Sequence, residues 1–199
     1  LTGPINDRYG SKRALLKSMR YGLELRLGRF ARYHNIDFAR VRRLVFVCKG
    51  NICRSPLADC WSRYRGLQAE SFGLNCGTDA PADPRAVDFA HRNGFDLEAH
   101  RTRPIAGYRP DAADLVVAME PLQALALQTT VGEAQLTLAG LWLQPPRPYI
   151  ADPYSSSAVY FDRCEHLVIE AAGLPVCRSP SPPGPCKRVL LMPSHAVFS

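Results

Sequence analysis

The sequence of 199 residues lacks any apolar run close to the roughly 20 residues that a membrane-spanning helix needs. It also lacks the uninterrupted apolar core of a secretory signal peptide, since its first residues are polar and basic, although the chain opens with Leu1 rather than Met. We therefore expect no integral membrane protein. A hydrophobic fraction of 46% with 22% charged residues also excludes a chain that is disordered throughout.

A regular cysteine framework is absent too. The cysteines are odd in number and irregular in spacing, which fits neither the disulfides of a small secreted protein nor a zinc site. The seven are Cys48, Cys53, Cys60, Cys76, Cys164, Cys177 and Cys186. We expect reduced thiols in a cytoplasmic protein, and neither a metal nor another cofactor.

The net charge of +7 is concentrated at the amino-terminal end of the chain. Residues 1–43 hold eleven Lys and Arg but only three acids, so the remaining residues are slightly acidic. The body of the protein therefore lacks the basic surface of a nucleic-acid-binding protein, and we expect no nucleic-acid partner. The basic segment predicts either peripheral contact with an acidic partner or membrane surface, or a solvated helix covering an edge of the body.

Three segments differ in composition. Residues 1–42 carry apolar residues at helical spacing among the arginines, which predicts an extension of one or two amphipathic helices. These apolar residues are Leu15, Leu16, Met19, Leu23, Leu27 and Phe30. Residues 43–174 read as one domain that closes its core without the extension. Residues 175–199 contain six prolines, which predicts a disordered tail.

Strand-like and helix-like stretches alternate four times in residues 43–174. The expected strands are residues 44–47, 68–73, 114–119 and 135–141, and the expected helices are residues 55–65, 83–93, 121–128 and 157–172. Such alternation predicts a single-domain α/β fold, an open four-stranded parallel sheet with helices on both faces. Ligands of such sheets bind at the carboxyl ends of the strands.

The first strand leads directly into residues 48–56, which read Cys-Lys-Gly-Asn-Ile-Cys-Arg-Ser-Pro. Cys48 ends the strand, and the helix begins at Arg54 and Ser55. Gly50 and Asn51 are the residue types best able to adopt left-handed backbone angles. A loop curled in this way points its backbone N–H groups inward and forms a nest for a tetrahedral oxyanion.

The side chains of this loop suit phosphoryl transfer. Arg54 supplies a planar cationic fork for phosphate oxygens, and the same positive field with the Ser55 hydroxyl stabilises Cys48 as a nucleophilic thiolate. A cysteine that ends a buried strand is more often a small core residue, and C-x5-R alone arises by chance. The full nine-residue pattern favours the catalytic interpretation because each position fits one role.

This loop resembles the phosphate loop of the low-molecular-weight protein tyrosine phosphatases. The resemblance covers about residues 43–173 and includes the segments Ala82–Val87, His100–Pro104, Asp114–Met119 and Pro148–Tyr154. Residues 141–149 are most similar to bacterial members. The resemblance implies that Cys48 is the nucleophile, Arg54 the phosphate-binding residue and Asp152 the general acid. Without the loop, the Asp-Pro at Asp152 would indicate an ordinary turn.

The resemblance also implies supporting roles. Asn51 would hold the loop through hydrogen bonds to Ser71 and His100, and Tyr154 would form an aromatic wall for a substrate ring. His100 is expected to be structural, and Tyr154 could equally be a half-exposed loop tyrosine. The rest of the phosphate-binding loop is Lys49, Gly50, Ile52, Cys53 and Ser55.

The implied activity is hydrolysis of protein phosphotyrosine and small aryl phosphates through a phosphocysteine intermediate. The implied partner is a tyrosine-phosphorylated protein, with a bacterial tyrosine kinase of polysaccharide export as the candidate. Alternatives on this fold are a protein arginine phosphatase, which usually carries Thr where Ile52 stands, and an arsenate reductase, for which residues 95–140 offer no suitable cysteines. A non-catalytic phosphate-binding module would be favoured if Cys48, Arg54 or Asp152 were missing.

Two residues of the loop leave questions open. Lys49 replaces the hydrophobic residue that usually follows the nucleophile and adds a charge near the mouth of the site. Cys53 could trap an oxidised Cys48 as a reversible disulfide, as the resemblance also implies, or it could simply pack beneath the loop.

Overall fold

The computed structural model of the protein describes residues 3–173. The expected Pro-rich tail, together with Cys177 and Cys186, lies outside the described residues. No helix in residues 3–173 has both the length and the apolar character needed to cross a membrane.

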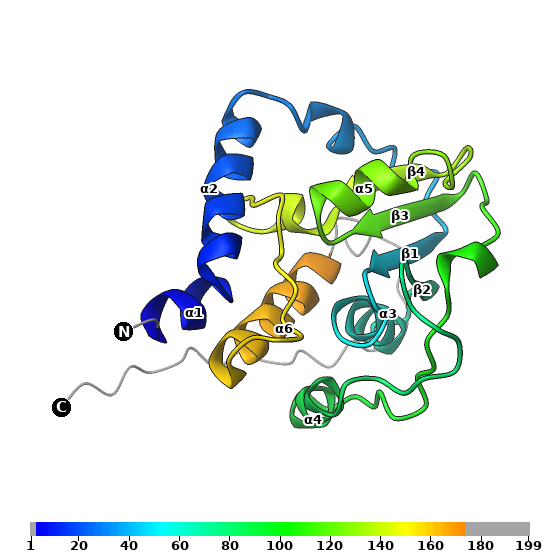
Figure 1. Ribbon diagram of the computed structural model, residues 1–199. Helices are drawn as coiled ribbons and strands as arrows, with labels where there is room; N and C mark the ends of the chain where they lie inside the picture. Colours follow the sequence, from blue (N-terminus) through cyan, green and yellow to red (C-terminus); the bar gives the residue numbers. More distant parts are fainter. Residues whose placement is uncertain (1–2, 174–199) are drawn as a thin grey trace.

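Four parallel strands form the sheet at the centre of the molecule (Figure 1). Their order is β2-β1-β3-β4, with β1 (Arg43–Cys48), β2 (Ala69–Gly73), β3 (Asp114–Ala118) and β4 (Gln135–Leu138). Because the strands are parallel, Cys48 at the end of β1 pairs with Gly73 at the end of β2. The open four-stranded parallel sheet expected from the sequence is confirmed.

Helices cover both faces of the sheet, as expected (Figure 1). Helices α3, α4 and α6 lie on one side and α5 on the other. Their bounds are α3 (Arg54–Tyr64), α4 (Pro84–Arg92), α5 (Pro121–Leu127) and α6 (Ala158–Ala172). Strand β4 is shorter than the expected 135–141, because the chain turns into a 3₁₀ helix over Ala139–Trp142 and the backbone of Arg147 packs closely against Gly140.

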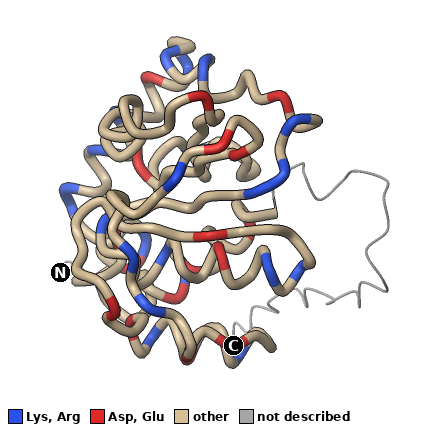
Figure 2. The backbone as a smooth tube through the Cα atoms, turned by 90° about the vertical axis from the view of Figure 1, so that its right-hand side faces the viewer, with Lys and Arg blue, Asp and Glu red and all other residues tan. Residues whose placement is uncertain are grey.

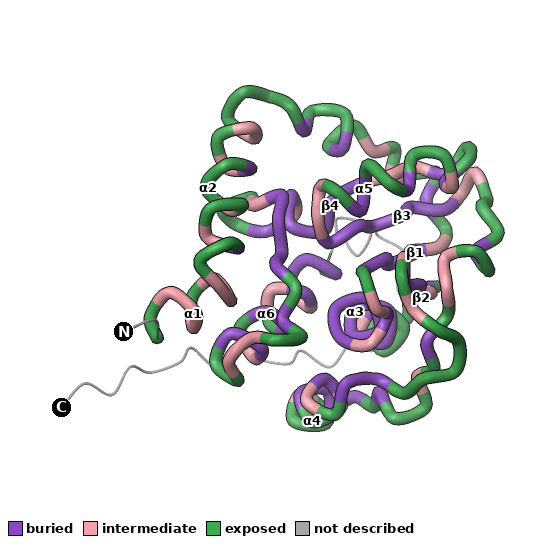
Figure 3. The backbone as a smooth tube through the Cα atoms, viewed as in Figure 1, coloured by how far each residue is buried: buried purple, intermediate pink, exposed green. Residues whose placement is uncertain are grey.

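The carboxyl edge of the sheet carries the loop between β1 and α3. Every residue of β1 from Leu44 to Cys48 is buried, because the helices exclude water from both sides of this central strand. Figure 3 shows β1, β3 and α3 as largely buried. The loop therefore extends from a fully buried strand at the centre of the sheet.

The amino-terminal residues form α1 (Gly3–Tyr9), α2 (Lys12–Arg26) and a 3₁₀ turn at Ala31–Tyr33. Helix α1 contacts α6, and the Ser157 hydroxyl donates to Asp7 at 2.7 Å. Ser11 caps α2 by accepting the backbone N–H of Ala14. Helix α2 runs along the side of the molecule toward which the strands point (Figure 1).

Side chains of this segment belong to the hydrophobic core of the body. The buried ones are Ala14, Tyr21, Phe30, Tyr33 and Val41. The Tyr21 ring lies 5.6 Å from the Tyr149 ring and 6.2 Å from Phe30, measured between centroids. Residues 1–42 therefore add side chains to the core of the body, which helical spacing alone does not reveal, and the division at residue 43 stays a prediction.

Replacing Tyr21 with Ala is expected to lower the free energy of unfolding by about 2–4 kcal/mol, because it leaves a cavity between α2 and Tyr149. Chemical denaturation measures this change. Leu23→Ala on the exposed face of the same helix, where the side chain is 58% exposed, is the matched control and should change stability by less than about 0.5 kcal/mol. Equal effects of the two substitutions would show that α2 does not share the core.

Candidate active site

Two donors meet the sulfur of Cys48 at the end of β1. The backbone N–H of Asn51 points at Sγ from 3.3 Å, and the Ser55 hydroxyl lies 3.0 Å from it. The loop can curl back on the sulfur because Asn51 adopts a left-handed backbone angle, with φ of 53°. Both groups can donate to a negatively charged sulfur, as a nucleophilic cysteine requires.

Asn51 fixes the shape of the loop through both of its amide atoms. Nδ2 donates to the Ser55 hydroxyl at 2.9 Å, and Oδ1 accepts the backbone N–H of Arg103 at 2.9 Å. The Asn51 carbonyl lies 2.7 Å from His100 Nε2. A carbonyl only accepts, so His100 carries a hydrogen on Nε2. Burial lowers the pKa of His100, which keeps the imidazole neutral and supports its expected structural role.

The expected hydrogen bond between Asn51 and Ser71 is absent. Ser71 on β2 instead donates to Asp59 of α3 at 3.1 Å, and Asp59 also pairs with Arg63 at 2.8 Å. The Asn51 amide is already satisfied by Ser55 and the Arg103 backbone. Ser71 therefore ties β2 to α3 beneath the loop rather than holding the loop itself.

The guanidinium of Arg54 is almost fully buried, at 1% exposure. Nη1 donates to Glu120 and to the Ile150 carbonyl, each at 2.8 Å, and Nη2 lies 3.2 Å from an Asp152 carboxylate oxygen. Burial opposes the charge, but Asp152, Cys48 and Glu120 outweigh it and raise the pKa of Arg54. The group therefore stays cationic.

The buried Nε–H donor of Arg54 is unpaired in the described part of the chain. Buried donors are rarely unpaired in proteins, so we expect this N–H to find a partner that residues 3–173 do not supply. Because Arg54 borders the pocket that also contains Cys48, this N–H can receive an anionic oxygen bound above the sulfur.

Cys48, Arg54 and Asp152 border one pocket of about 190 Å³. The other lining residues are Lys49, Gly50, Ile52, Cys53 and Tyr154, so the structure brings together most of the residues that the sequence indicated. The Asp152 side chain is 40% exposed, which leaves it accessible to substrate and water. A larger hollow of about 380 Å³ lies beside β2 and has no cysteine among its lining residues.

The loop that carries Asp152 is anchored from α4. Arg85 donates to the Tyr154 carbonyl at 2.8 Å and pairs with Asp83 at 2.7 Å. The Tyr154 side chain itself is 57% exposed, as an aromatic wall at the mouth of a pocket would be. Its role as a substrate wall stays a prediction.

Cys53 is buried at the amino-terminal end of α3. Burial raises the pKa of its thiol, and the nearby carboxylates of Glu165 and Asp83 raise it further. It is a free thiol in the structure, as is Cys48. Its packing beneath the loop is compatible with both interpretations of this residue, and redox control stays a prediction.

Three residues that support the site were not expected from the sequence, namely Glu120, Arg85 and Arg103. A signal existed for Glu120, because it follows β3, the neighbour of β1, and the carboxyl ends of parallel strands meet at one edge. Arg103 acts through its backbone and Arg85 through a carbonyl of a distant loop, and neither contact has a pattern in the sequence.

The family profile described as "Low molecular weight phosphotyrosine protein phosphatase" matches residues 43–173. Among curated relatives, the low-molecular-weight protein-tyrosine-phosphatase Etp of Escherichia coli K12 is 35% identical over 62% of this chain and 83% of its own. The probable phosphatase EpsP of Ralstonia nicotianae is 29% identical over 64% of this chain and 89% of its own.

Solved structures agree with this family. Wzb of Vibrio vulnificus in complex with benzylphosphonate has a TM-score of 0.59 at 28% identity and covers 70% of this chain and 99% of its own. Tyrosine phosphatase Wzb of Escherichia coli K30 in complex with sulphate has a TM-score of 0.57 at 29% identity, over 66% and 94% of the two chains. The YwlE arginine phosphatase of Geobacillus stearothermophilus, at 24% identity and a TM-score of 0.53, shares the fold.

Glu165 on α6 is a further buried ionisable group near the site. It has no exposed surface, and neither carboxylate oxygen has a hydrogen-bond partner within the described part of the chain. Burial raises its pKa to about 8, although Arg54 acts in the opposite direction. The folded protein therefore holds a proton that the unfolded chain, with a pKa of 4.5, releases first.

Glu165 should make stability depend on pH in a defined direction. The contribution of Glu165 to the free energy of unfolding is full below pH 4.5 and is lost as the pH rises through about 8. We expect Glu165→Gln to match wild type near pH 5 and to exceed its unfolding free energy near pH 8.5, by on the order of 2–4 kcal/mol. Denaturation from pH 5 to 9 measures the difference, and Glu170→Gln on the exposed face of α6 is the control. Parallel pH profiles for wild type and Glu165→Gln would contradict the protonated state.

Proposed function

The chain belongs to the low-molecular-weight phosphotyrosine protein phosphatase family, and we propose that Cys48, Arg54 and Asp152 perform its reaction, the hydrolysis of protein phosphotyrosine and small aryl phosphates. The observation that carries this assignment is the shared pocket, in which the sulfur of Cys48 lies with the unpaired Nε–H of the buried Arg54 and with Asp152. Residues 43–174 would form the catalytic domain, with residues 1–42 as its extension.

The first step is the transfer of the phosphoryl group to the enzyme. The backbone N–H groups of the loop and the guanidinium of Arg54 bind the phosphate oxygens, and the thiolate of Cys48 attacks phosphorus in line. An S–P bond forms while the bond from phosphorus to the phenolic oxygen breaks. The electron pair stays on that oxygen, which takes a proton from Asp152.

The second step is hydrolysis of the phosphocysteine. Asp152, now a carboxylate, removes a proton from water as the water oxygen attacks phosphorus. The S–P bond breaks, inorganic phosphate leaves and the thiolate of Cys48 is restored. Ser55 and the N–H of Asn51 stabilise the sulfur as a leaving group in this step, because both contact it directly.

Glu120 and the Ile150 carbonyl have a positioning role. Both accept from Nη1 of Arg54 and hold the guanidinium plane while its other donors receive the phosphate. The ion pair between Asp152 and Nη2 keeps the acid near the site before substrate arrives. Binding of a phosphoryl dianion replaces Asp152 as the partner of Nη2, and Asp152 then takes up a proton from water, which it gives to the leaving oxygen.

Phosphotyrosine is favoured over phosphoarginine by the apolar Ile52 and the aromatic Tyr154 at the pocket, which suit an aryl ester. The natural substrate would be a tyrosine-phosphorylated protein of the cytoplasm, with a bacterial tyrosine kinase of polysaccharide export as the candidate, since the chain resembles bacterial members of the family. Parallel assays of p-nitrophenyl phosphate, a phosphoarginine protein and arsenate separate these activities. Only the first should turn over efficiently.

Cys48→Ser is expected to abolish turnover of p-nitrophenyl phosphate while vanadate binding persists, because the nest and Arg54 remain and only the nucleophile is lost. Steady-state kinetics and calorimetry measure the two properties. Residual turnover above about a thousandth of wild type would count against a phosphocysteine intermediate.

Asp152→Asn should slow aryl phosphates with poor leaving groups by roughly 10²–10⁴-fold and activated aryl phosphates far less, since only the former need a proton as the P–O bond breaks. The slope of log kcat/KM against the pKa of the leaving phenol reports this difference. A uniform loss across all leaving groups would refute the role of Asp152 as the general acid.

A further inference from the structure

The outward face of α2 carries a stripe of large apolar side chains that nothing in residues 3–173 covers. Leu16, Met19 and Leu23 of α2 are 67%, 65% and 58% exposed, and Leu27, which caps the end of the helix, is 64% exposed. At 3.6 residues per turn, these four positions fall within about 80° of arc on the helix surface. Figure 3 shows α2 as largely exposed, in contrast to α3.

Basic residues flank this apolar stripe on both sides. Arg13 and Arg20 follow one margin and Arg26 lies on the other, while Lys12 lies in line with the stripe at the amino-terminal end of the helix, as the helical spacing places them. All four are exposed. The one acid of α2, Glu24, is engaged by Arg20 at 2.8 Å. In the body, by contrast, acidic and basic residues are interspersed (Figure 2).

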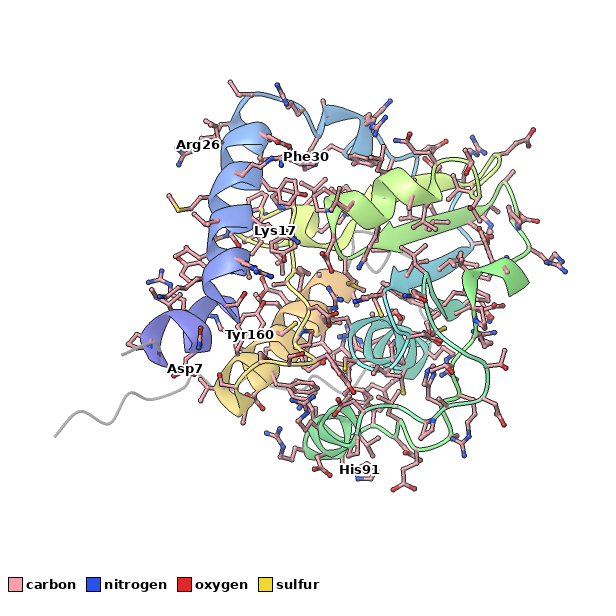
Figure 4. The ribbon with its side chains drawn as sticks, in the orientation of Figure 1. Asp7, Lys17, Arg26, Phe30, His91 and Tyr160 are labelled. Atoms are coloured by element: carbon pink, nitrogen blue, oxygen red, sulfur yellow. The ribbon has the colours of Figure 1, made fainter. Side chains whose placement is uncertain are left out.

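The opposite face of α2 is fixed to the body. Tyr21 is buried against Tyr149, and the Lys17 ammonium lies 5.7 Å from the centre of the same Tyr149 ring. Figure 4 shows Lys17 and Phe30 directed toward the body and Arg26 directed away from it. The stripe is thus presented by a helix that the core holds in place.

We propose that α2 binds an anionic lipid surface, with the apolar stripe entering the boundary between headgroups and acyl chains and the flanking cations contacting lipid phosphates. An apolar centre with basic margins is the pattern of helices that lie in a membrane interface. The charge also argues against a second copy as the occupant, because two such faces would bring their basic margins together.

This binding would set the orientation of the active site. Tyr149, which α2 contacts, precedes Ile150, whose carbonyl accepts from Arg54. Docking through α2 would therefore hold the pocket at a fixed position relative to the membrane and favour phosphoproteins located there. The lipid-binding proposal itself does not depend on the assigned catalytic roles.

The test is co-sedimentation of the full chain with vesicles of phosphatidylcholine alone or with about one third phosphatidylglycerol. We expect at least about tenfold tighter binding to the anionic vesicles, weakening steeply between low and high salt. Two triple variants probe the two parts of the surface, Leu16→Ser/Met19→Ser/Leu23→Ser for the stripe and Arg13→Gln/Arg20→Gln/Arg26→Gln for the margins. Each should weaken binding at least about tenfold.

The matched control is Leu122→Ser/Leu125→Ser on α5, where two leucines are 58% and 57% exposed. It should bind as wild type does, and all three variants should keep the p-nitrophenyl phosphate activity of wild type, which verifies their fold. Absent binding to anionic vesicles, equal binding to neutral ones or an equal loss in the α5 variant would overturn the proposal. So would a dimer in sedimentation velocity that the stripe variant dissociates, since the occupant would then be a second copy.

Discussion

The buried guanidinium of Arg54 connects parts of the chain that lie far apart in the sequence. It follows the loop of Cys48, and it binds Glu120 after β3, the Ile150 carbonyl and Asp152 on the loop before α6. A buried cation is stable only when its charge is paired and its donors are used. We propose that a phosphate oxygen completes this network at the unpaired Nε–H.

The need to pair buried charges also explains which groups around the site are charged. One cation, Arg54, faces the carboxylates of Asp152 and Glu120 and the sulfur of Cys48. A further negative charge on the buried Glu165 would be unfavourable beside them, and burial holds a proton on that carboxyl up to a pKa of about 8. Helix α2 contacts a neighbour of this network, because it packs on Tyr149, which precedes the Ile150 carbonyl that Arg54 binds.

The parallel strands, the helices that alternate with them and the loop of Cys48 and Arg54 could be predicted from the sequence, because apolar strand-like runs and the loop pattern are local signals. Asp152 is indicated by the resemblance to the phosphatase family, since Asp-Pro alone indicates a turn. The partner of Ser71 could not be predicted, because the choice between Asn51 and Asp59 depends on how β2 meets α3. The shared core of α2 escaped prediction for a similar reason: the spacing that indicates an amphipathic helix does not state which of its apolar faces is buried, and here Tyr21 is inside while Leu23 is outside.

The central claim is that the phosphoryl group passes through the sulfur of Cys48. The most direct test is acid quenching of the enzyme during turnover of an aryl phosphate, followed by peptide mass spectrometry of residues 43–63. The account predicts one phosphoryl group on Cys48, present during turnover and lost when substrate is exhausted. A peptide that stays unmodified throughout turnover, or a phosphoryl group on Ser55 in place of Cys48, would contradict it.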